Sequence, residues 1–577
     1  MTAAGVAAAV AGALFLTPAQ AASNPPSPAR PASATASAKE LNHRLAVATA
    51  GDDLPGATSR SALSGAADTR TGRIDPKIIG GTTTTIAKAP WMAQLWYGDD
   101  RGTASTADDI GFFCGGAVVA PTKILTAAHC VKGYNWKAHG TAVVGATTLA
   151  DADSLHGGTA VGVWRQWNHP SYNSVTIDND IAVLTLNVPV KVTPIRMTTA
   201  ADTASYKAGT AAKVYGWGRT TSTTQDLSAT LKTADLPIRS DATCAGFYGA
   251  DFIKGHNVCA GAPASGSDTG TTSSCNGDSG GPLVVGGRIA GVVSWGVRDC
   301  VARGAYSVFT KVSTYVGVTY PRLDDTNLSG DHYADLWMRT ASGRTGYERD
   351  SKGTSLAGRE SWGDWSGFDL VLQTDLDRDD YQDLLVRRAS DGDVFWKHFV
   401  PSRNAWSTKL VGDNWKSRLA VLAPGDVTGD YQPDLVSVDS AGVLWVYPGK
   451  GNGTFAARVK AGTGWKSFSW VRGHGDFSGD GIADLVARKK SNGAVYLYKG
   501  RGNGTFAAGV KITTWSGSAY NAFAAVGDVN GDSRADFLAR TPGGTLYLLR
   551  GTGKSGSAAF AARLSLGTTF KQYDLFG

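Results

Sequence analysis

An acidic motif recurs about every 50 residues through the C-terminal half of this chain of 577 residues. Its clearest copy is the sequence DVTGD at residues 426–430, followed by a further aspartate at Asp434. The five copies begin at residues 327, 375, 426, 476 and 528. A period of this length is typical of repeated supersecondary units, most often the blades of a β-propeller. Five copies favour five blades, while six or seven blades with degenerate copies stay open.

Each copy has the composition of a loop that binds a divalent cation. Side-chain oxygens at positions 1, 3, 5 and 9 of a tight turn can converge on one hard cation such as Ca²⁺, and glycine at position 4 permits the turn. Arg378 replaces that glycine in the second copy. The first copy begins on Asn327 and has the fewest carboxylates, so we expect the first copy to bind the cation most weakly. The alternative is that the aspartates only cap solvated turns, but the regular spacing favours calcium. The predicted ligands are Asp375, Asp377, Asp379, Asp383, Asp426, Asp430, Asp434, Asp476, Asp480, Asp484, Asp528, Asn530, Asp532 and Asp536.

Strand-like segments follow each loop, for example LVSV at residues 435–438 and VLWVY at 443–447. These flanks argue against an EF-hand, which needs helices and an acidic residue at position 12. The pattern resembles the FG-GAP/VCBS repeats of integrin α-chain propellers, and the resemblance implies a calcium-binding propeller over residues 321–577. Ten tryptophans lie between Trp337 and Trp515. Most are expected to pack between blades, and a minority to stack on a sugar or a protein target.

A different kind of motif, CNGDSGGP, occupies residues 275–282. A serine hydroxyl attacks well only when a base takes its proton, and its attack on a carbonyl creates an oxyanion that needs preplaced donors. Glycines around Ser279 allow a sharp turn in which the N–H groups of Gly277 and Ser279 point at one oxygen. Alone, this run is also compatible with a simple glycine-rich turn. Two other segments supply partners: LTAAHC at residues 125–130 contains His129, and DNDIAVL at residues 178–184 contains Asp180.

The chain order His129, Asp180, Ser279, with these flanks, resembles the chymotrypsin/trypsin family of serine proteases. The resemblance covers residues 78–320 and implies two packed β-barrels with the three side chains in the cleft between them. It implies that Ser279 is the nucleophile, His129 the general base and then acid, and Asp180 the group that orients and stabilises the imidazolium, with no cofactor required. Short Val-, Ile-, Leu- and Trp-rich runs between Gly, Asn, Asp and Thr clusters independently predict an all-β domain.

All six cysteines lie inside this protease-like segment. An even number in one exported domain indicates disulfides, although six cysteines permit 15 pairings. No Cys-x-x-Cys or paired-histidine spacing supports zinc binding. The family resemblance selects the pairs Cys114–Cys130, Cys244–Cys259 and Cys275–Cys300.

The primary substrate pocket departs from that of trypsin. Ser273 stands six residues before the nucleophile, where the family has an aspartate in enzymes that cleave after Arg or Lys. A guanidinium buried without a carboxylate would be strongly penalised. The resemblance places the pocket walls at Ser294, at Gly296 and at Ser307, where glycine is frequent. We therefore expect apolar P1 residues, with Arg/Lys specificity as the alternative.

The N-terminus is typical of an exported precursor. Residues 1–22 are predicted to be a secretory signal peptide, because they contain a small-residue apolar run and an Ala-x-Ala cleavage site. They lack a basic start, so the true start is expected upstream. Residues 23–77, rich in Ala, Ser, Pro and Thr, are predicted to be a disordered pro-segment. In the resembled family, cleavage before Ile78 frees an amino group that pairs with the carboxylate preceding the catalytic serine, here Asp278. Since an apolar-cutting enzyme does not cleave after Lys77, a separate activating protease is expected.

Composition narrows the partners. Charged residues make up 18% of the chain, and its net charge of +7 is spread without basic blocks, so nucleic acid is not expected as a partner. No later run approaches the roughly 18 apolar residues of a membrane helix. We expect a secreted endopeptidase that acts on proteins or peptides and carries a propeller for a polysaccharide or cell-surface ligand. The alternatives are a secreted binding protein with a non-catalytic protease-like domain and, more weakly, an esterase, because the serine lacks a G-x-S-x-G elbow.

Overall fold

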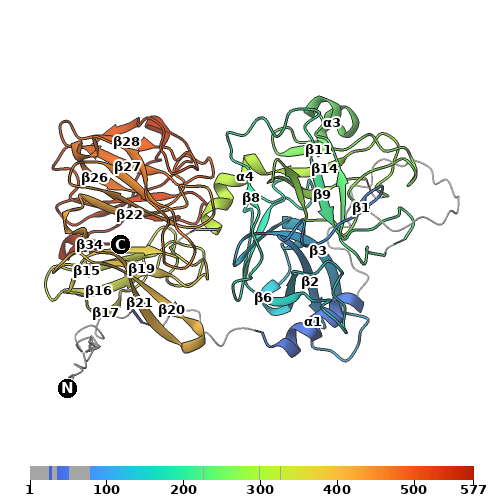
Figure 1. The fold of residues 1–577 in the computed structure, drawn as a ribbon, viewed down its shortest axis with the longest axis horizontal. Coiled ribbons are helices and arrows are strands. Elements are labelled where there is room, and N and C mark those ends of the chain that lie inside the picture. The colour runs from blue at the N-terminus through green and yellow to red at the C-terminus, as the bar shows by residue number, and fades with distance from the viewer. Residues whose placement is uncertain are drawn as a thin grey trace, which may run out of the picture.

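The computed structural model describes residues 25, 26, 28, 36–50, 78–224, 226–297, 299–324 and 326–577. The predicted signal peptide and most of the predicted pro-segment lie outside the described residues. Two domains lie side by side in Figure 1, the protease-like domain in blue to green and the C-terminal domain in yellow to red, with helix α4 (Val312–Thr319) between them. Within the described residues, no helix has the length and apolar character needed to cross a membrane.

The first half of the protease-like domain is a closed barrel in the order β2-β3-β4-β7-β6-β5. Its strands are β2 (Met92–Asp99), β3 (Ile110–Ala120), β4 (Lys123–Thr126), β5 (Gly140–Val144), β6 (Thr159–Asn168) and β7 (Ala182–Leu186). Apolar side chains such as Leu95, Val118 and Leu184 pack in its core. Because β4 and β7 are antiparallel and pair Thr126 with Ala182, the residues that follow β4 and precede β7 meet at one edge of the barrel.

The second half is an eight-stranded sheet in the order β1-β10-β9-β12-β13-β14-β11, with β8 paired to β13. Its strands are β1 (Thr82–Thr83), β8 (Arg196–Met197), β9 (Lys213–Gly216), β10 (Lys232–Asp235), β11 (Asn257–Ala260), β12 (Pro282–Val285), β13 (Arg288–Trp295) and β14 (Ser307–Lys311). A bridge between Ile238, just after β10, and Ala260 of β11 joins the two ends. The sheet therefore curls back on itself, which matches the expected second barrel.

The C-terminal domain consists of five four-stranded antiparallel sheets. Sheet by sheet, the strands are β15 (Leu336–Thr340), β16 (Thr345–Arg349), β17 (Glu360–Asp364) and β34 (Tyr573–Phe576); β18 (Phe368–Thr374), β19 (Asp383–Arg388), β20 (Val394–Val400) and β21 (Ala405–Gly412); β22 (Ala420–Gly425), β23 (Asp434–Val438), β24 (Leu444–Tyr447) and β25 (Val459–Gly462); β26 (Phe468–Arg472), β27 (Leu485–Lys489), β28 (Ala494–Tyr498) and β29 (Val510–Thr514); β30 (Ala522–Gly527), β31 (Asp536–Arg540), β32 (Leu546–Leu549) and β33 (Leu564–Gly567). Strands β18, β22, β26, β30 and β34 contact one another in a ring.

This ring confirms the all-β propeller predicted from the repeat, and it has five blades. The last strand, β34, completes the first blade by pairing with β15 (Met338 with Phe576), so the two ends of the domain close the ring. Each acidic motif lies in the turn that leads into the second strand of a blade, as the motif at residues 375–383 does between β18 and β19. Seven of the ten tryptophans are less than a tenth exposed: Trp337, Trp362, Trp365, Trp396, Trp415, Trp465 and Trp515.

The N-terminal region contains a helix that the sequence analysis did not predict. Residues 23–77 were expected to be disordered, but Ala38–Ala50 form helix α1, which packs on the first barrel (Figure 1). The Ser37 hydroxyl accepts the N–H of Glu40, as in a capping box, so S-x-x-E was the signal that the analysis missed. Its short Ala-rich sequence gives little helical stability on its own, and the apolar face formed by Leu41, Leu45 and Ala48 is buried only by tertiary packing.

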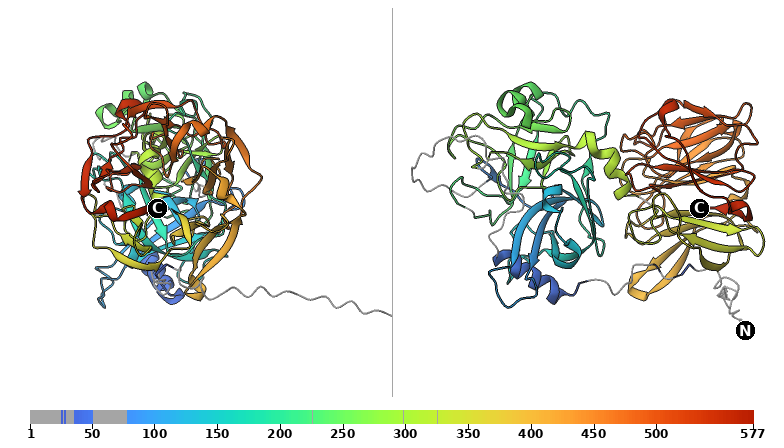
Figure 2. Two further views of the ribbon diagram at one scale, coloured as in Figure 1. Left: turned by 90° about the vertical axis from the view of Figure 1, so that its left-hand side faces the viewer. Right: turned by 180° about the vertical axis from the view of Figure 1, so that it is seen from behind.

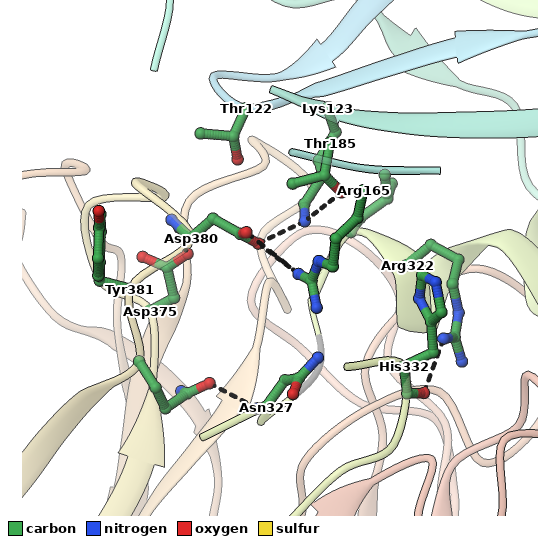
Figure 3. A network of polar contacts seen from close by, with 12 residues as sticks. Thr122, Lys123, Arg165, Thr185, Arg322, Asn327, His332, Asp375, Asp380 and Tyr381 are labelled. Carbon is green, nitrogen blue, oxygen red and sulfur yellow. Dashed lines mark hydrogen bonds and ion pairs between the residues drawn. The ribbon is translucent and has the colours of Figure 1, made fainter. Parts of the chain in front are cut away.

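The two domains meet through a network of buried charges, drawn in Figure 3. Asp380, in the second acidic loop of the propeller, lies 2.6 Å from Lys123 Nζ on β4 and accepts two hydrogen bonds from Arg165 on β6, at 3.0 and 3.1 Å. The side chains of Lys123 and Asp380 are only 5% and 8% exposed. The backbone N–H of Ala200 also donates to the Asp480 carbonyl in the fourth loop, at 3.1 Å. The propeller therefore presents its acidic loops to the protease-like domain.

Replacing Asp380 with alanine is expected to loosen the contact between the domains. The change removes the carboxylate shared by Lys123 and Arg165, and breaking a buried pair costs about 3–5 kcal/mol. The matched control is Asp369→Ala, because Asp369 pairs with Arg387 in an exposed position, where a pair contributes about 1 kcal/mol or less. Thermal unfolding and small-angle X-ray scattering measure the effect. An Asp380→Ala protein as compact and stable as the control would contradict the assigned contact.

Candidate active site

The central contact of the candidate site joins His129 and Asp180. Nδ1 of His129 lies 2.8 Å from Oδ2 of Asp180, and the backbone N–H of His129 donates to Oδ1 of the same carboxylate, also at 2.8 Å. The Ser294 hydroxyl donates a third hydrogen bond to Asp180 Oδ2 at 2.6 Å. Asp180 is 1% exposed, so these three donors offset the cost of burying its carboxylate. The imidazole is consequently fixed in orientation by a buried acid.

The chain places His129 directly after β4, in the 3₁₀ turn Ala128–Cys130. The disulfide Cys114–Cys130 ties this turn to β3. The other two disulfides are Cys244–Cys259 and Cys275–Cys300, so all three pairs implied by the family resemblance are present. Cys114, His129 and Cys130 lie close enough to resemble a metal site, but both sulfurs belong to the disulfide.

Ser279 lies in a turn that runs between the two halves of the domain. Its carbonyl accepts the N–H of Gly115 on β3 at 2.8 Å, and the N–H of Gly280 donates to Val293 on β13 at 2.9 Å. Gly277 has a φ of 90°, a conformation that favours glycine. A side chain at Gly280 would place its Cβ 2.1 Å from the Thr126 hydroxyl, at the end of β4 that leads to His129. The glycines of the motif therefore allow the Ser279 turn to approach the His129 strand closely.

Asp278 is fully buried beneath this turn. Its carboxylate accepts the backbone N–H groups of Gly218 at 2.8 Å and Cys275 at 2.9 Å. Burial raises the pKa of Asp278 to about 7, and the two hydrogen bonds only partly oppose that shift. Ile78, the first described residue after the N-terminal region, is also completely buried and packs in the core of the second barrel. Asp278 is therefore a buried acid, bound by two backbone N–H groups, immediately before Ser279.

The four predicted pocket residues lie on segments adjoining the Ser279 turn. The Ser273 hydroxyl donates to the Cys300 carbonyl at 2.9 Å, and the Ser307 hydroxyl accepts the N–H of Ser274 at 2.9 Å. Gly296 has open space where a side chain would begin. Ser294 was predicted as a pocket wall, and its hydrogen bond to Asp180 was not foreseen. The sequence carried no local signal for that bond, since the two residues are 114 positions apart.

Two of the acidic propeller loops bring their carboxylates together. Asp375, Asp377 and Asp383 each place one oxygen within 4.8 Å of the others, and Asp476, Asp480 and Asp484 do the same. Asp383 is 1% exposed, and its Oδ1, like Oδ1 of Asp377, is buried without a hydrogen-bond partner among the described residues. Burial, followed by repulsion from Asp377, raises the pKa of Asp375 to about 8. Both loops thus concentrate negative charge that a divalent cation would offset.

The loops that begin at Asp426 and Asp528 are arranged differently, although they carry the same sequence motif. In the described residues, the carboxylates of Asp426, Asp430 and Asp434 and those of Asp528, Asp532 and Asp536 form no such group. Asp434 instead accepts backbone N–H groups of Val427, Thr428 and Gly449, and Asn530 donates to Asp532. Asp528 accepts a hydrogen bond from the guanidinium of Arg322, in the segment that joins the two domains.

A further acidic group was missed by the sequence analysis. Asp335, at the end of the first loop, lies together with Glu348 on β16 and with Asp350, just after that strand. Burial raises the pKa of Glu348 to about 8, with Asp335 as the next cause. Asp379, a predicted ligand of the second loop, is not part of that loop's group. Only the tertiary position of β16 beside the first loop reveals the Asp335 group, because Glu348 lies outside every motif.

Comparison with known proteins agrees with this geometry. The Trypsin family model matches residues 78–319, the FG-GAP-like repeat model matches residues 426–487 and 476–539, and the FG-GAP repeat model matches residues 520–559. A trypsin from Saccharopolyspora erythraea is 36% identical over 247 residues, covering 43% of this chain and 98% of that protein. Human (Homo sapiens) kallikrein-14 is 36% identical over 243 residues, covering 41% of this chain and 81% of its own length.

The fold and these relatives together define a serine endopeptidase. The chain belongs to the trypsin family of serine proteases, and FG-GAP repeats form its C-terminal propeller.

Proposed function

We propose that the protein is a secreted endopeptidase whose reaction is carried by Ser279, His129 and Asp180. Ser279 Oγ attacks the peptide carbonyl while His129 accepts its proton, and His129 then donates that proton to the leaving amine. Water, deprotonated by His129, releases the acyl group from Ser279 in the second half of the reaction. The observation that supports this most strongly is the buried Asp180, which holds His129 through two hydrogen-bonding contacts at 2.8 Å.

The oxyanion is proposed to bind the backbone N–H groups of Gly277 and Ser279. A left-handed φ at Gly277 turns the backbone sharply just before the nucleophile. A side chain at Gly277 would place its Cβ 2.4 Å from Leu227 and 3.1 Å from the backbone of Gly218. Glycine is therefore required at this position on grounds of both conformation and space. Donors placed in this way stabilise the charge that develops on the substrate oxygen.

Activation is proposed to follow cleavage between Lys77 and Ile78. The new amino group of Ile78 would supply a cation to the buried carboxylate of Asp278. Asp278 lies immediately before Ser279, and its carboxylate accepts hydrogen bonds from the backbone N–H groups of Gly218 and of Cys275. An ion pair there would order the turn after cleavage, because a buried carboxylate without a cation is costly. The precursor is accordingly proposed to be inactive.

The proposed P1 preference is for apolar side chains. Ser273 brings no charge to the pocket, and its hydroxyl is already bonded to the Cys300 carbonyl. The second candidate, cleavage after Arg or Lys, is favoured by the names of the relatives, several of which are trypsins. The identity of residue 273 favours the apolar preference over the Arg/Lys preference. With serine at this position, a bound guanidinium would have no carboxylate there to pair with.

A P1 profile of the cleaved enzyme tests this proposal. On peptides that differ only at P1, we expect kcat/KM for Phe, Tyr or Leu to exceed that for Arg by at least about 10²-fold. Ser273→Asp is expected to raise cleavage after Arg and Lys, and Ser267→Asp, in an exposed loop, is the control for added charge. Preference for Arg in the unmodified enzyme would retain the protease and reject the pocket assignment. Failure to cleave any peptide would favour the non-catalytic binding protein.

The propeller is proposed to bind Ca²⁺ in the loops that contain Asp383 and Asp484. Carboxylate oxygens without hydrogen-bond partners at Asp377 and Asp383 fit a hard cation, which takes oxygen ligands. When bound, the cation would offset repulsion within each group and hold the loop between two strands. Figure 3 shows Asp375 of this group beside Asp380, so the loop also takes part in the contact with the protease-like domain. A polysaccharide or cell-surface molecule remains the proposed ligand of the propeller.

Replacing Asp383 or Asp484 with asparagine is expected to lower calcium affinity by about tenfold or more, since each change removes one negative ligand. The control is Asp439→Asn, because Asp439 lies in an ordinary turn, where it accepts the backbone N–H of Val443 and the indole N–H of Trp445. Isothermal titration with Ca²⁺ measures affinity, and melting with and without chelator measures stability. If the full chain binds no Ca²⁺, or if all three variants bind alike, the calcium assignment is wrong.

A further inference from the structure

Helix α1 is anchored in the protease-like domain as part of its core. Leu45 and Ala48 belong to one buried cluster with Met92 and Trp96 of β2 and Phe113 of β3. Leu45 is 1% exposed and Ala48 2%. Removal of the helix would expose this aromatic surface to water, which is unfavourable in proportion to the apolar area. The helix is therefore held by the same packing that stabilises the enzyme domain.

The fit between α1 and β2 is close enough to be specific. A side chain at Gly98 on β2 would place its Cβ 2.0 Å from the backbone oxygen of Arg44 and 2.8 Å from the backbone nitrogen of Ala48. The Arg44 guanidinium donates to the Gly140 carbonyl at 3.1 Å and to Glu40 at 2.9 Å. His43 lies 2.8 Å from Asp100, just beyond β2. Backbone, apolar and charged contacts all fix the helix at one position on the barrel.

The same N-terminal region also contacts the propeller. The Pro26 carbonyl accepts the indole N–H of Trp406, on β21, at 3.1 Å. Pro26 and Pro28 line a cavity of about 240 Å³ whose walls come from both domains, with Trp164 from β6 and Trp362 and Tyr381 from the propeller. Asp380, the shared carboxylate of Figure 3, lines this cavity as well. The proline residues thus lie against the joint between the domains, and α1 lies on the barrel beyond it (Figure 2).

We propose that the N-terminal segment (described residues 25, 26, 28 and 36–50) remains bound after activation, as a non-covalent second chain that bridges the protease-like domain and the propeller. The proposal rests on the cleavage between Lys77 and Ile78 proposed above. The segment contains no cysteine, and the six cysteines of the chain pair with one another, so no disulfide would join it to the rest of the protein after cleavage. The segment lies upstream of the cleavage point and makes contacts that do not involve the cleaved bond.

The test uses a full chain with a defined cleavage site. Arg73→Asp, Ile74→Asp and Pro76→Asp convert residues 73–77 to the enteropeptidase sequence DDDDK, and Ser279→Ala prevents self-digestion. After cleavage, N-terminal sequencing must find Ile78 as the new first residue. Gel filtration followed by intact-mass analysis is then expected to find the N-terminal fragment eluting in equal amount with residues 78–577. Separation of the fragment from the enzyme would overturn the proposal.

Matched variants identify the contacts responsible. Leu45→Asp is expected to release the fragment, whereas Asn42→Asp, which adds the same charge on the exposed side of α1, is expected to retain it. Trp406→Phe removes the donor to Pro26 and is expected to raise the dissociation rate of the fragment several-fold, while most of the fragment stays bound through α1 at equilibrium. Amide hydrogen exchange reports α1 directly in the uncleaved chain, should Leu45→Asp impair folding. Retention of the Leu45→Asp fragment would contradict the assigned helix contact.

A second assay distinguishes failure of the proposal that the segment stays bound from failure of the proposal that cleavage before Ile78 activates the enzyme. An otherwise identical protein with Ser279 intact reports activity after the same enteropeptidase cleavage. If cleavage yields no activity but the fragment stays bound, the activation proposal is wrong and the bridging segment stands. If activity appears and the fragment leaves, the reverse holds.

Discussion

Alanine at position 279 is expected to reduce kcat by about 10⁶-fold in the cleaved enzyme, because the change removes the proposed nucleophile that forms the acyl intermediate. A residual rate about 10³–10⁴-fold above that in water is expected from substrate binding and the oxyanion donors. The KM is expected to change little, since Ser279 contributes to the reaction more than to substrate binding. Single-turnover assays on a peptide ester and a peptide amide measure both parameters.

Asparagine at position 180 tests the same arrangement from the other side. The change keeps the shape of the side chain but removes the charge that faces His129, and kcat is expected to fall by about 10⁴-fold. The matched control is Asp178→Asn, in the same turn, because Asp178 pairs with His256 rather than His129. Equal losses in the two variants would mean that the turn, and not the Asp180 charge, limits the reaction.

Replacing Asp278 with asparagine is expected to have different consequences before and after cleavage. In the cleaved enzyme, Asp278→Asn would leave the Ile78 ammonium buried without its carboxylate, and activity is expected to fall on the order of 10³-fold. In the precursor, the carboxylate itself is the costly group, since burial raises its pKa to about 7 from the ordinary 3.8. Asparagine at this position is therefore expected to lower the activity of the cleaved enzyme and to stabilise the folded precursor.

The pH dependence of the precursor follows from this raised pKa. The folded protein holds the Asp278 proton more tightly than the unfolded chain does. The contribution of protonated Asp278 to the free energy of unfolding is therefore fully present below about pH 4 and is lost as pH rises through 7. The loss amounts to on the order of 4 kcal/mol. Denaturant melts of the Ser279→Ala precursor, with and without Asp278→Asn, should diverge between pH 4 and 8. A stability difference that stays constant with pH would contradict the account.

The fold of both domains could be predicted from the sequence because the motifs that indicate it are local or repeated. The period near 50 residues specified the propeller, and the closure by β34 follows from the need to satisfy the edge of β15. The segments around His129, Asp180 and Ser279 likewise contain strand-forming and turn-forming residues that determine the local backbone conformation of each segment. Each acidic motif, and each of the segments that contain His129, Asp180 and Ser279, spans about ten consecutive residues or fewer.

What the sequence did not predict depends on contacts between distant segments. Ser294 meets Asp180 only after both halves of the protease-like domain have folded. Glu348 joins Asp335 because β16 returns beside the first loop, and Arg322 reaches Asp528 only across the joint between domains. Helix α1 is the clearest case, since its composition favours disorder and its apolar residues are buried by distant residues on β2 and β3.

Labelling with a fluorophosphonate tests the central claim most directly. This reagent phosphonylates a serine only when a neighbouring base activates it and an oxyanion site accepts the product oxygen. We predict one phosphonyl group on Ser279 of the chain cleaved before Ile78, much slower labelling of the precursor, and none on the Ser279→Ala variant. An unlabelled cleaved enzyme, or a label found on another residue, would contradict the assignment of His129, Asp180 and Ser279 as the catalytic residues.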